Sequence, residues 1–150
     1  MALLHAARRG DYGALCLWNP MHRVALFGEE SLQSFEQRGF VDSPLASGQT
    51  LRLDRDILDD AHDNREALDI GAACAQISAP VLLVYGARDP LNRGGGRDAL
   101  EMALAHNPPE VRVIERTGHT FGSRHPLTQR PPALEEALAT STDWLSRQLA

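Results

Sequence analysis

Runs of apolar residues predict the strands of a parallel sheet. They lie near 13–18, 80–85 and 110–115, and the run APVLLVYG at 79–86 is the strongest. The first two strands are apolar on both faces, which is typical of parallel sheets covered by helices on both sides. The third alternates valine with arginine before an isoleucine, which predicts a strand near the edge of the sheet.

Helical periodicity predicts the elements between and after these strands. Short helices are expected over 28–39 and 97–107, and a longer one over 64–77 with Asn64 as its cap. The residues of 131–150 predict a final helix. Its inner face is expected to hold Leu134, Ala137, Leu138, Leu145 and Leu149, with Trp144 beside them.

The late order strand, helix, strand, helix predicts an α/β fold of three layers with a short, mostly parallel sheet. The region 20–78 is long for a simple crossover, and we expect it to carry an inserted or cap-like helical element. Within it, SPLASGQT at 43–50 predicts a break, and LRLDRDILDD at 51–60 predicts a short strand that enters a helix. We interpret 1–150 as a single domain.

Composition narrows the class of protein. The net charge of −5 provides no basic surface for nucleic acid or anionic lipid. No apolar stretch is long enough for a membrane span, and the N-terminus does not have the pattern of a secretory signal. Cys16 and Cys74 lie in apolar segments and are interpreted as reduced core thiols. These features together predict a cytoplasmic protein.

Two polar residues follow late strands and point to chemistry. Asp89 comes just after VLLVYG, and His119 comes just after VRVIE in the stretch ERTGHTFGSRHP. Functional groups of open parallel sheets gather beyond the carboxyl ends of the strands. We therefore expect the Asp89 carboxylate within hydrogen-bond reach of the His119 imidazole, as in the acid and base of a nucleophilic triad.

The ordered stretches ISAPVLLVYGARDP and VRVIERTGHTF resemble the last two strands of an α/β-hydrolase. GHTFGSRHP and TSTDWLSRQL resemble the dienelactone-hydrolase-like and peptidase-like serine esterases of that superfamily. GALCLWNP resembles the strand after the nucleophile helix, and ALLHAARR resembles the end of that helix. The resemblance implies Asp89 as the acid and His119 as the base of a serine hydrolase acting on ester, lactone or peptide-like acyl bonds, without cofactor or metal.

The sequence departs from this family at the nucleophile. No G-x-S-x-G occurs in the 150 residues, and Ser47 follows no predicted strand and has a glycine on one side only. The chain therefore resembles the C-terminal half of such an enzyme and is expected to be inactive alone. A nucleophile-bearing half would complete it for a small acyl substrate. The alternative is a non-catalytic half-domain that pairs with another chain.

Other residues allow different interpretations. Asp89 followed by proline is also typical of a turn, and His125 is the alternative to His119. The glycine-rich NRGGGRD at 92–98 is interpreted as a flexible loop beside the acid. A run of carboxylates alternates with arginines and is interpreted as a solvated helix face rather than a metal site. Its members are Asp54, Asp56, Asp59, Asp60 and Asp63, with His62 among them.

The strand at 13–18 predicts an interaction surface. The resemblance places the missing half along one side of this strand, and no charged residue lies within the run. Unprotected strand edges promote pairing between chains. We expect Ala14, Leu15, Cys16, Leu17 and Trp18 to expose backbone and apolar groups there, so that the chain forms a homo-oligomer or binds a complementary half.

Overall fold

The computed structural model describes residues 1–24, 27–44 and 48–150. Ser47, the serine considered above, lies outside the described residues. Within these ranges, none of the helices combines the length and the apolar character that a membrane span requires.

The chain divides into two compact units. One comprises Met1–His22 and Ile70–Ala150 and contains the three-stranded sheet; we call it the sheet unit. The other, Arg23–Asp69, contains a two-stranded antiparallel sheet, and we call it the hairpin unit. The hairpin unit falls inside the region predicted to be inserted.

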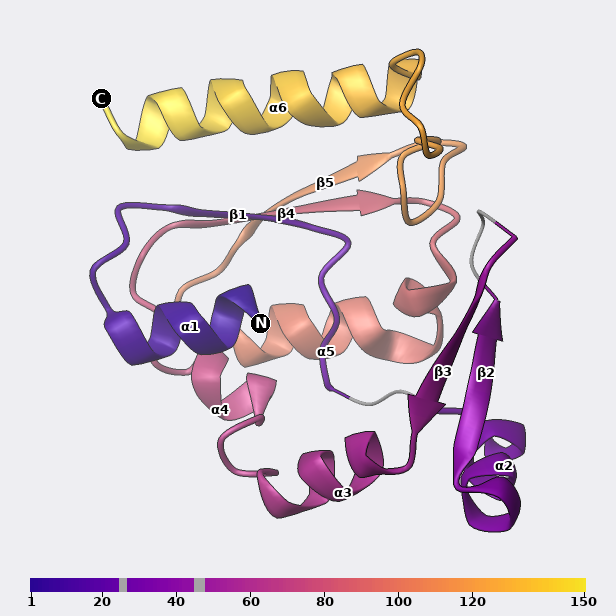
Figure 1. Ribbon diagram of the computed structural model, residues 1–150. Coiled ribbons are helices and arrows are strands. Elements are labelled where there is room, and N and C mark those ends of the chain that lie inside the picture. Colours follow the sequence, from indigo (N-terminus) through magenta and orange to yellow (C-terminus); the bar gives the residue numbers. More distant parts are fainter. Residues whose placement is uncertain (25–26, 45–47) are drawn as a thin grey trace. The chain divides into compact units, whose positions relative to one another are not determined.

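The sheet unit is built on three parallel strands in the order β1, β4, β5 (Figure 1). They are β1 (Leu15–Trp18), β4 (Val81–Gly86) and β5 (Glu110–Ile114). All three predicted strands are confirmed. The register pairs Leu17 with Leu83 and Leu83 with Val111, so the strands end along one edge. We call this the carboxyl edge of the sheet.

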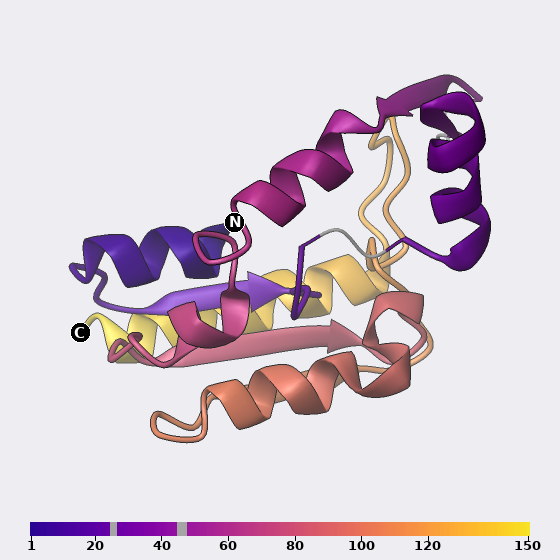
Figure 2. The same cartoon turned by 90° about the horizontal axis from the view of Figure 1, so that it is seen from below.

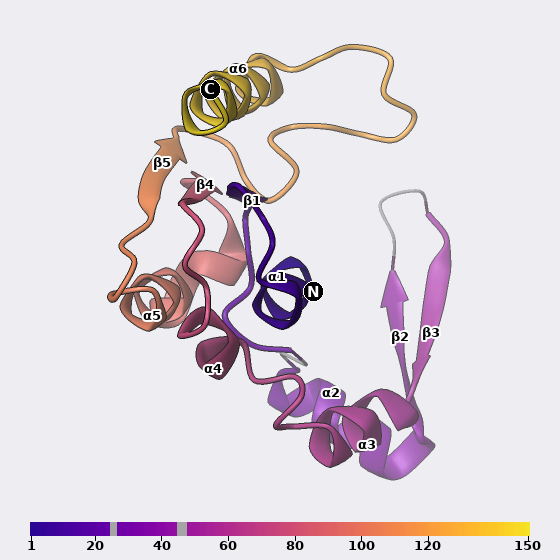
Figure 3. The same cartoon turned by 90° about the vertical axis from the view of Figure 1, so that its left-hand side faces the viewer.

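Helices cover both faces of this sheet, which confirms the three-layer α/β fold (Figures 1 and 3). Helix α6 (Pro132–Gln148) lies on one face. Helices α1 (Ala2–Arg9), α4 (Ile70–Cys74) and α5 (Gly96–Ala103) lie on the other. Seen from that second side, α1 and α5 run along the strands (Figure 2). Because β4 is central, every residue in it is buried.

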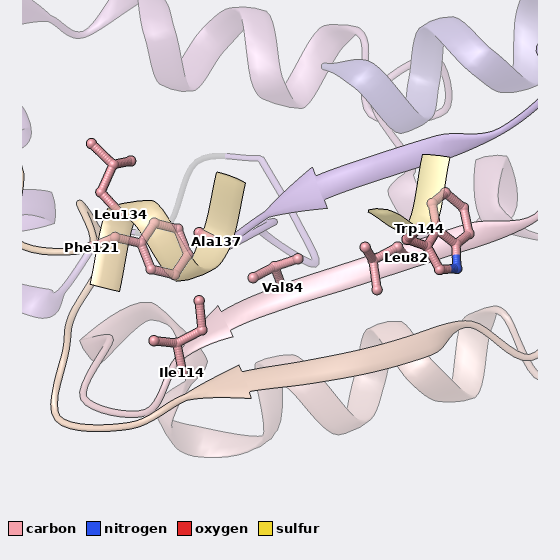
Figure 4. Packing of buried hydrophobic residues seen from close by; sticks show 7 residues of the cluster. All are labelled: Leu82, Val84, Ile114, Phe121, Leu134, Ala137 and Trp144. Atoms are coloured by element: carbon pink, nitrogen blue, oxygen red, sulfur yellow. The ribbon is translucent and has the colours of Figure 1, made fainter. Parts of the chain in front are cut away.

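The face under α6 holds a hydrophobic cluster. Alternate residues of a strand point to the same side, so Leu82 and Val84 share this face. They pack with Ile114, Phe121, Leu134, Ala137 and Trp144 (Figure 4). Partly buried Cys16 joins this cluster, whereas Cys74 is buried in α4 on the opposite face, and no disulfide links the two.

The prediction for the inner face of α6 was partly wrong. Leu138 is 37 % exposed and Leu149 is 64 % exposed, whereas Ser141 is buried. The hydroxyl of Ser141 accepts a hydrogen bond from the Trp18 indole nitrogen at 2.8 Å, and it donates to the carbonyl of Ala137. Because its hydroxyl both donates and accepts a hydrogen bond, a serine can occupy this buried position in place of a leucine.

Strand β1 is less exposed than its sequence suggested. Leu15 and Leu17 are buried, and Trp18 is 38 % exposed. Ala14 and Cys16 are partly buried against the α6 cluster. The apolar surface that this strand offers to water is therefore mainly that of Trp18.

The predicted helix over 64–77 was also wrong in its first half. Asn64 ends the preceding helix: its backbone N–H donates to the carbonyl of Asp60, and its side chain donates to the Asp60 carboxylate. The next helix, α4, begins only at Ile70. An asparagine can cap either the beginning or the end of a helix. Here both of its hydrogen-bond acceptors belong to Asp60, four residues earlier in the chain, so it caps the end.

The hairpin unit is not purely helical. It contains α2 (Glu29–Arg38), β2 (Phe40–Pro44), β3 (Thr50–Asp54) and α3 (Asp56–Asp63). The strand and helix expected over 51–60 are confirmed. Strand β2 was missed, and the expected break at 43–50 is wrong at both of its ends, because Ser43 and Pro44 belong to β2 and Thr50 begins β3. The guanidinium groups of Arg38 and Arg52 lie 4.3 and 3.8 Å from the centre of the Phe40 ring.

Tyr85 provides a test of packing on the second face of the sheet. The residue is 1 % exposed, and within the described ranges its hydroxyl has no hydrogen-bond partner. Burial, reinforced by Glu101, raises the pKa of this phenol well above its usual value. Because a buried hydroxyl without a partner is destabilising, we expect Tyr85→Phe to raise the free energy of unfolding by about 1 kcal/mol.

The same substitution should also reduce the fall in the free energy of unfolding at alkaline pH. Above about pH 10 an unfolded tyrosine ionises while buried Tyr85 stays neutral, so stability falls as pH rises through this range. Tyr12→Phe, at a residue that is 38 % exposed, is the matched control. Urea titrations at neutral and alkaline pH measure both effects, and a stability loss at neutral pH would show that the Tyr85 hydroxyl has a partner.

Candidate active site

Asp89 is placed by the turn that follows β4. Its backbone N–H donates to the carbonyl of Gly86 at 3.0 Å, which closes the turn. Its carboxylate Oδ1 accepts from the backbone N–H of Leu91 at 3.0 Å and caps the 3₁₀ helix Pro90–Gly95. The side chain is 0 % exposed. The turn interpretation of Asp89 is therefore correct, and it leaves the second carboxylate oxygen available.

His119 is placed by the loop that follows β5. The backbone N–H of Arg88 donates to the carbonyl of Thr117 at 2.8 Å, and that of Ala87 donates to Ile114 at 2.9 Å. These bonds join the loop after β5 to the loop after β4. Beyond His119, the buried Phe121 ring packs edge-to-face on Trp18 with centroids 5.4 Å apart. The histidine is thus held between two anchored points.

The structure brings Asp89 and His119 together at the carboxyl edge. His119 Nδ1 lies 2.8 Å from Asp89 Oδ2. An ionised carboxylate only accepts hydrogen bonds, so the shared proton sits on Nδ1. The imidazole is 49 % exposed, and its Nε2 makes no hydrogen bond to the described residues. A neutral His119 therefore presents the lone pair of Nε2 to solvent, where it can accept a proton.

This arrangement depends on a close approach at Gly86. A Cβ atom added there would lie 2.9 Å from the carbonyl oxygen of Thr117 and closer still to that of Gly118. Both oxygens belong to the rigid backbone of the loop that carries His119. Only glycine allows β4 and this loop to pass so closely.

Asn19 is a residue of this site that the sequence analysis missed. It follows β1, is 3 % exposed and has a positive φ of 43°. Its Oδ1 accepts from the backbone N–H of Gly86, and its Nδ2 donates to the carbonyl of His119, both at 2.8 Å. The sequence analysis placed the first strand near 13–18 and assigned no role to Asn19. The signal that could have found it is the one used for Asp89: a polar residue directly after a parallel strand.

The other candidate residues lie apart from this pair. His125 is exposed and is not bonded to Asp89. The carboxylates of α3 are exposed, and no group of three metal-ligating side chains converges anywhere in the described part of the chain. NRGGGRD, interpreted as a loop, is helical. It forms the end of the 3₁₀ helix and the start of α5, because Asp89 and Pro90 initiate a helical turn.

Comparison with known proteins gives a match in structure only. No family model matches the chain, and no curated protein sequence does. A monoacylglycerol lipase from Paleococcus ferrophilus matches 98 % of the chain with a TM-score of 0.63 and 16 % identity. Est1E from Butyrivibrio proteoclasticus, solved with ferulic acid, matches 99 % with a TM-score of 0.67 and 16 % identity.

An esterase domain from Rhodothermus marinus matches 97 % of the chain with a TM-score of 0.59 and 16 % identity. The chain spans between 55 and 64 % of the length of these three structures. At this level of identity the likeness shows the fold. The three-layer arrangement of the sheet unit is thus shared with part of each of these proteins.

Gly86 and Gly118 provide a paired test of the close approach. Gly86→Ala forces the loop of His119 away from β4, and we expect it to lower the free energy of unfolding by about 1–3 kcal/mol. It should also abolish the hydrogen bond between His119 and Asp89. Gly118→Ala is the control, because its Cβ would lie 3.8 Å from the nearest atom, the carbonyl oxygen of Arg88.

Denaturant titration measures the stability of both variants, and the downfield NMR signal of the His119 Nδ1 proton reports the hydrogen bond. If both alanine variants behaved alike, the contact at Gly86 would not be what positions the loop.

Proposed function

Because the chain has part of an α/β-hydrolase fold, we propose that Asp89 and His119 are the acid and base of a serine hydrolase. The proposed substrates are small molecules with an ester, lactone or peptide-like acyl bond. The observation that carries the proposal is the 2.8 Å contact between His119 Nδ1 and a fully buried carboxylate. The similar structures include a monoacylglycerol lipase and an esterase domain, which supports the acyl class.

The roles follow from the geometry. His119 Nε2 takes the proton of a serine hydroxyl while the serine oxygen bonds to the carbonyl carbon of the substrate. The proton then passes from Nε2 to the leaving oxygen or nitrogen as the acyl bond breaks. A water molecule then attacks the acyl-serine with the same proton transfers through Nε2, which breaks the bond to serine and releases the carboxylic acid. Asp89 keeps the proton on Nδ1 and stabilises the imidazolium that forms in each step. These steps use no metal or cofactor.

The serine in this proposal lies outside these 150 residues. The sequence contains no G-x-S-x-G, and we propose that a nucleophile-bearing half supplies the serine and the donors of the oxyanion hole. That half is either a further segment of the same polypeptide or a separate chain.

A fluorophosphonate probe, which labels activated serines, tests this proposal. The tagged protein is expressed in its native cells and purified with whatever binds to it. We expect a labelled serine in the segment or chain that accompanies residues 1–150. His119→Ala should slow labelling about 100-fold or more, because the general base is lost. His125→Ala is the matched control and should label normally.

Labelling that is insensitive to His119→Ala, or no labelling at all, would contradict the proposal. The isolated 150-residue chain is expected to hydrolyse p-nitrophenyl acetate no faster than the trace rate of a surface histidine, because the serine and the oxyanion donors are both missing. Substantial hydrolysis that disappears on Ser47→Ala would place the nucleophile inside the chain instead.

A second candidate function is that of a non-catalytic half-domain that pairs with another chain. The observation that favours it is the outer edge of β1. Strand β1 pairs with β4 on one side, and no other described strand pairs with it. The backbone N–H groups of Leu15 and Asn19 donate to the carbonyls of Pro80 and Val84, on the side of β4. Those of the alternate residues Cys16 and Trp18 therefore point to the open side. Unpaired groups of this kind favour strand addition.

Cys16→Pro tests this edge. Proline has no backbone N–H, so this change removes one donor from the open side of β1 and leaves the hydrogen bonds between β1 and β4 in place. If the edge pairs between copies, the wild-type chain should sediment as a dimer or larger species at micromolar concentration, and Cys16→Pro should be monomeric. Cys16→Ala is the matched control, since it makes a similar loss of packing and keeps the N–H. A monomeric wild type with a cooperative melt would contradict self-association through β1.

A further inference from the structure

We propose that Asn19 is a positioning residue, which holds the backbone of His119 so that its imidazole stays on Asp89. This inference rests on the proposed function, since it concerns how the same acid and base are held. It is carried by the contacts of a single buried amide, which follows β1 and joins the end of β4 to the loop after β5.

Both ends of the Asn19 side-chain amide are hydrogen-bonded, and the two ends have different partners. The carbonyl oxygen accepts from the N–H of Gly86 at 2.8 Å, with the Asn92 amide at 3.4 Å as a weaker donor. The amide nitrogen donates to the carbonyl of His119 at 2.8 Å. The partner on one side belongs to the strand that leads to Asp89, and the partner on the other is the backbone of the base itself.

The backbone of Asn19 fixes this amide in place. Its own N–H donates to the carbonyl of Val84 at 2.8 Å, so the residue is tied to the end of β4. Its φ of 43° lies in the left-handed region, which asparagine tolerates better than most residues. With 3 % of the residue exposed, water has little access to replace either bond.

The chemistry of this position selects an amide. Aspartate can accept from Gly86 but has no N–H for the carbonyl of His119, and its charge would oppose that carbonyl. Glycine retains the left-handed backbone but has neither group. Loss of the amide leaves a buried donor and a buried acceptor without partners, and the loop relaxes to reach water.

This relaxation matters because of how His119 is held. Its imidazole is half exposed, and the ring is hydrogen-bonded to Asp89. The position of the ring therefore follows the position of its backbone. A displacement of about 0.5 Å is enough to impair a catalytic contact of this kind.

The tautomer of His119 provides the test, measured by long-range proton–nitrogen NMR on the 150-residue chain at alkaline pH. Wild type should show the Nδ1–H tautomer. In Asn19→Gly and Asn19→Asp, we expect the ratio of Nδ1–H to Nε2–H to fall about fivefold or more, the effect of losing one hydrogen bond. The downfield Nδ1 proton should also weaken.

Asn107→Ala is the matched control. The amide of Asn107 donates to the carbonyls of Ile77 and Ala79, next to the beginning of β4 and away from the carboxyl edge. Its loss should lower the melting temperature without changing the His119 tautomer. If Asn19→Gly and Asn19→Asp lowered the melting temperature and left the tautomer unchanged, Asn19 would be a structural residue only and the proposal would be wrong.

Asp89→Asn separates this inference from the proposed function. Its amide should favour the opposite tautomer of His119. If Asp89→Asn leaves the His119 signals unchanged, the pair itself does not form in solution and the proposed function fails. If Asp89→Asn changes them and the Asn19 variants do not, only the role of Asn19 is overturned.

Discussion

The contact between β4 and the loop after β5 at Gly86 is the constraint on which the site depends. The two segments approach so closely that no side chain fits between them, and backbone hydrogen bonds from Ala87 and Arg88 join them. Asp89 and His119 are carried by these joined segments, which brings their side chains to 2.8 Å. The geometry of the pair is thus a property of the sheet rather than of long flexible loops.

Asp89 and His119 could be predicted because their positions follow from a topological rule. Asp89 lies shortly after β4 and His119 shortly after β5, and parallel neighbours end at the same edge. Asn19 obeys the same rule, but an asparagine before a proline is also typical of a turn, and the sequence does not show that the amide is buried. Whether a polar residue is buried depends on segments such as the His119 loop, which are distant in the chain.

The errors of element prediction have a similar cause. Strand β2 contains Ser43 and Pro44, which are typical of turns, and none of its residues is fully buried, so no apolar alternation marks this strand. On α6, Ser141 interrupts the apolar stripe, and its hydrogen bond with Trp18 comes from a residue far away in sequence. Local patterns predicted β4 well because both of its faces are covered.

The two thiols lie on opposite faces of the sheet, Cys16 against α6 and Cys74 in α4. A disulfide needs Cβ atoms about 3.5–4.5 Å apart, and the sheet stands between these two. Oxidation therefore cannot form a Cys16–Cys74 disulfide within the folded sheet unit. A Cys16–Cys74 bond can therefore form only in molecules that have opened, and it would keep them from refolding until it is reduced.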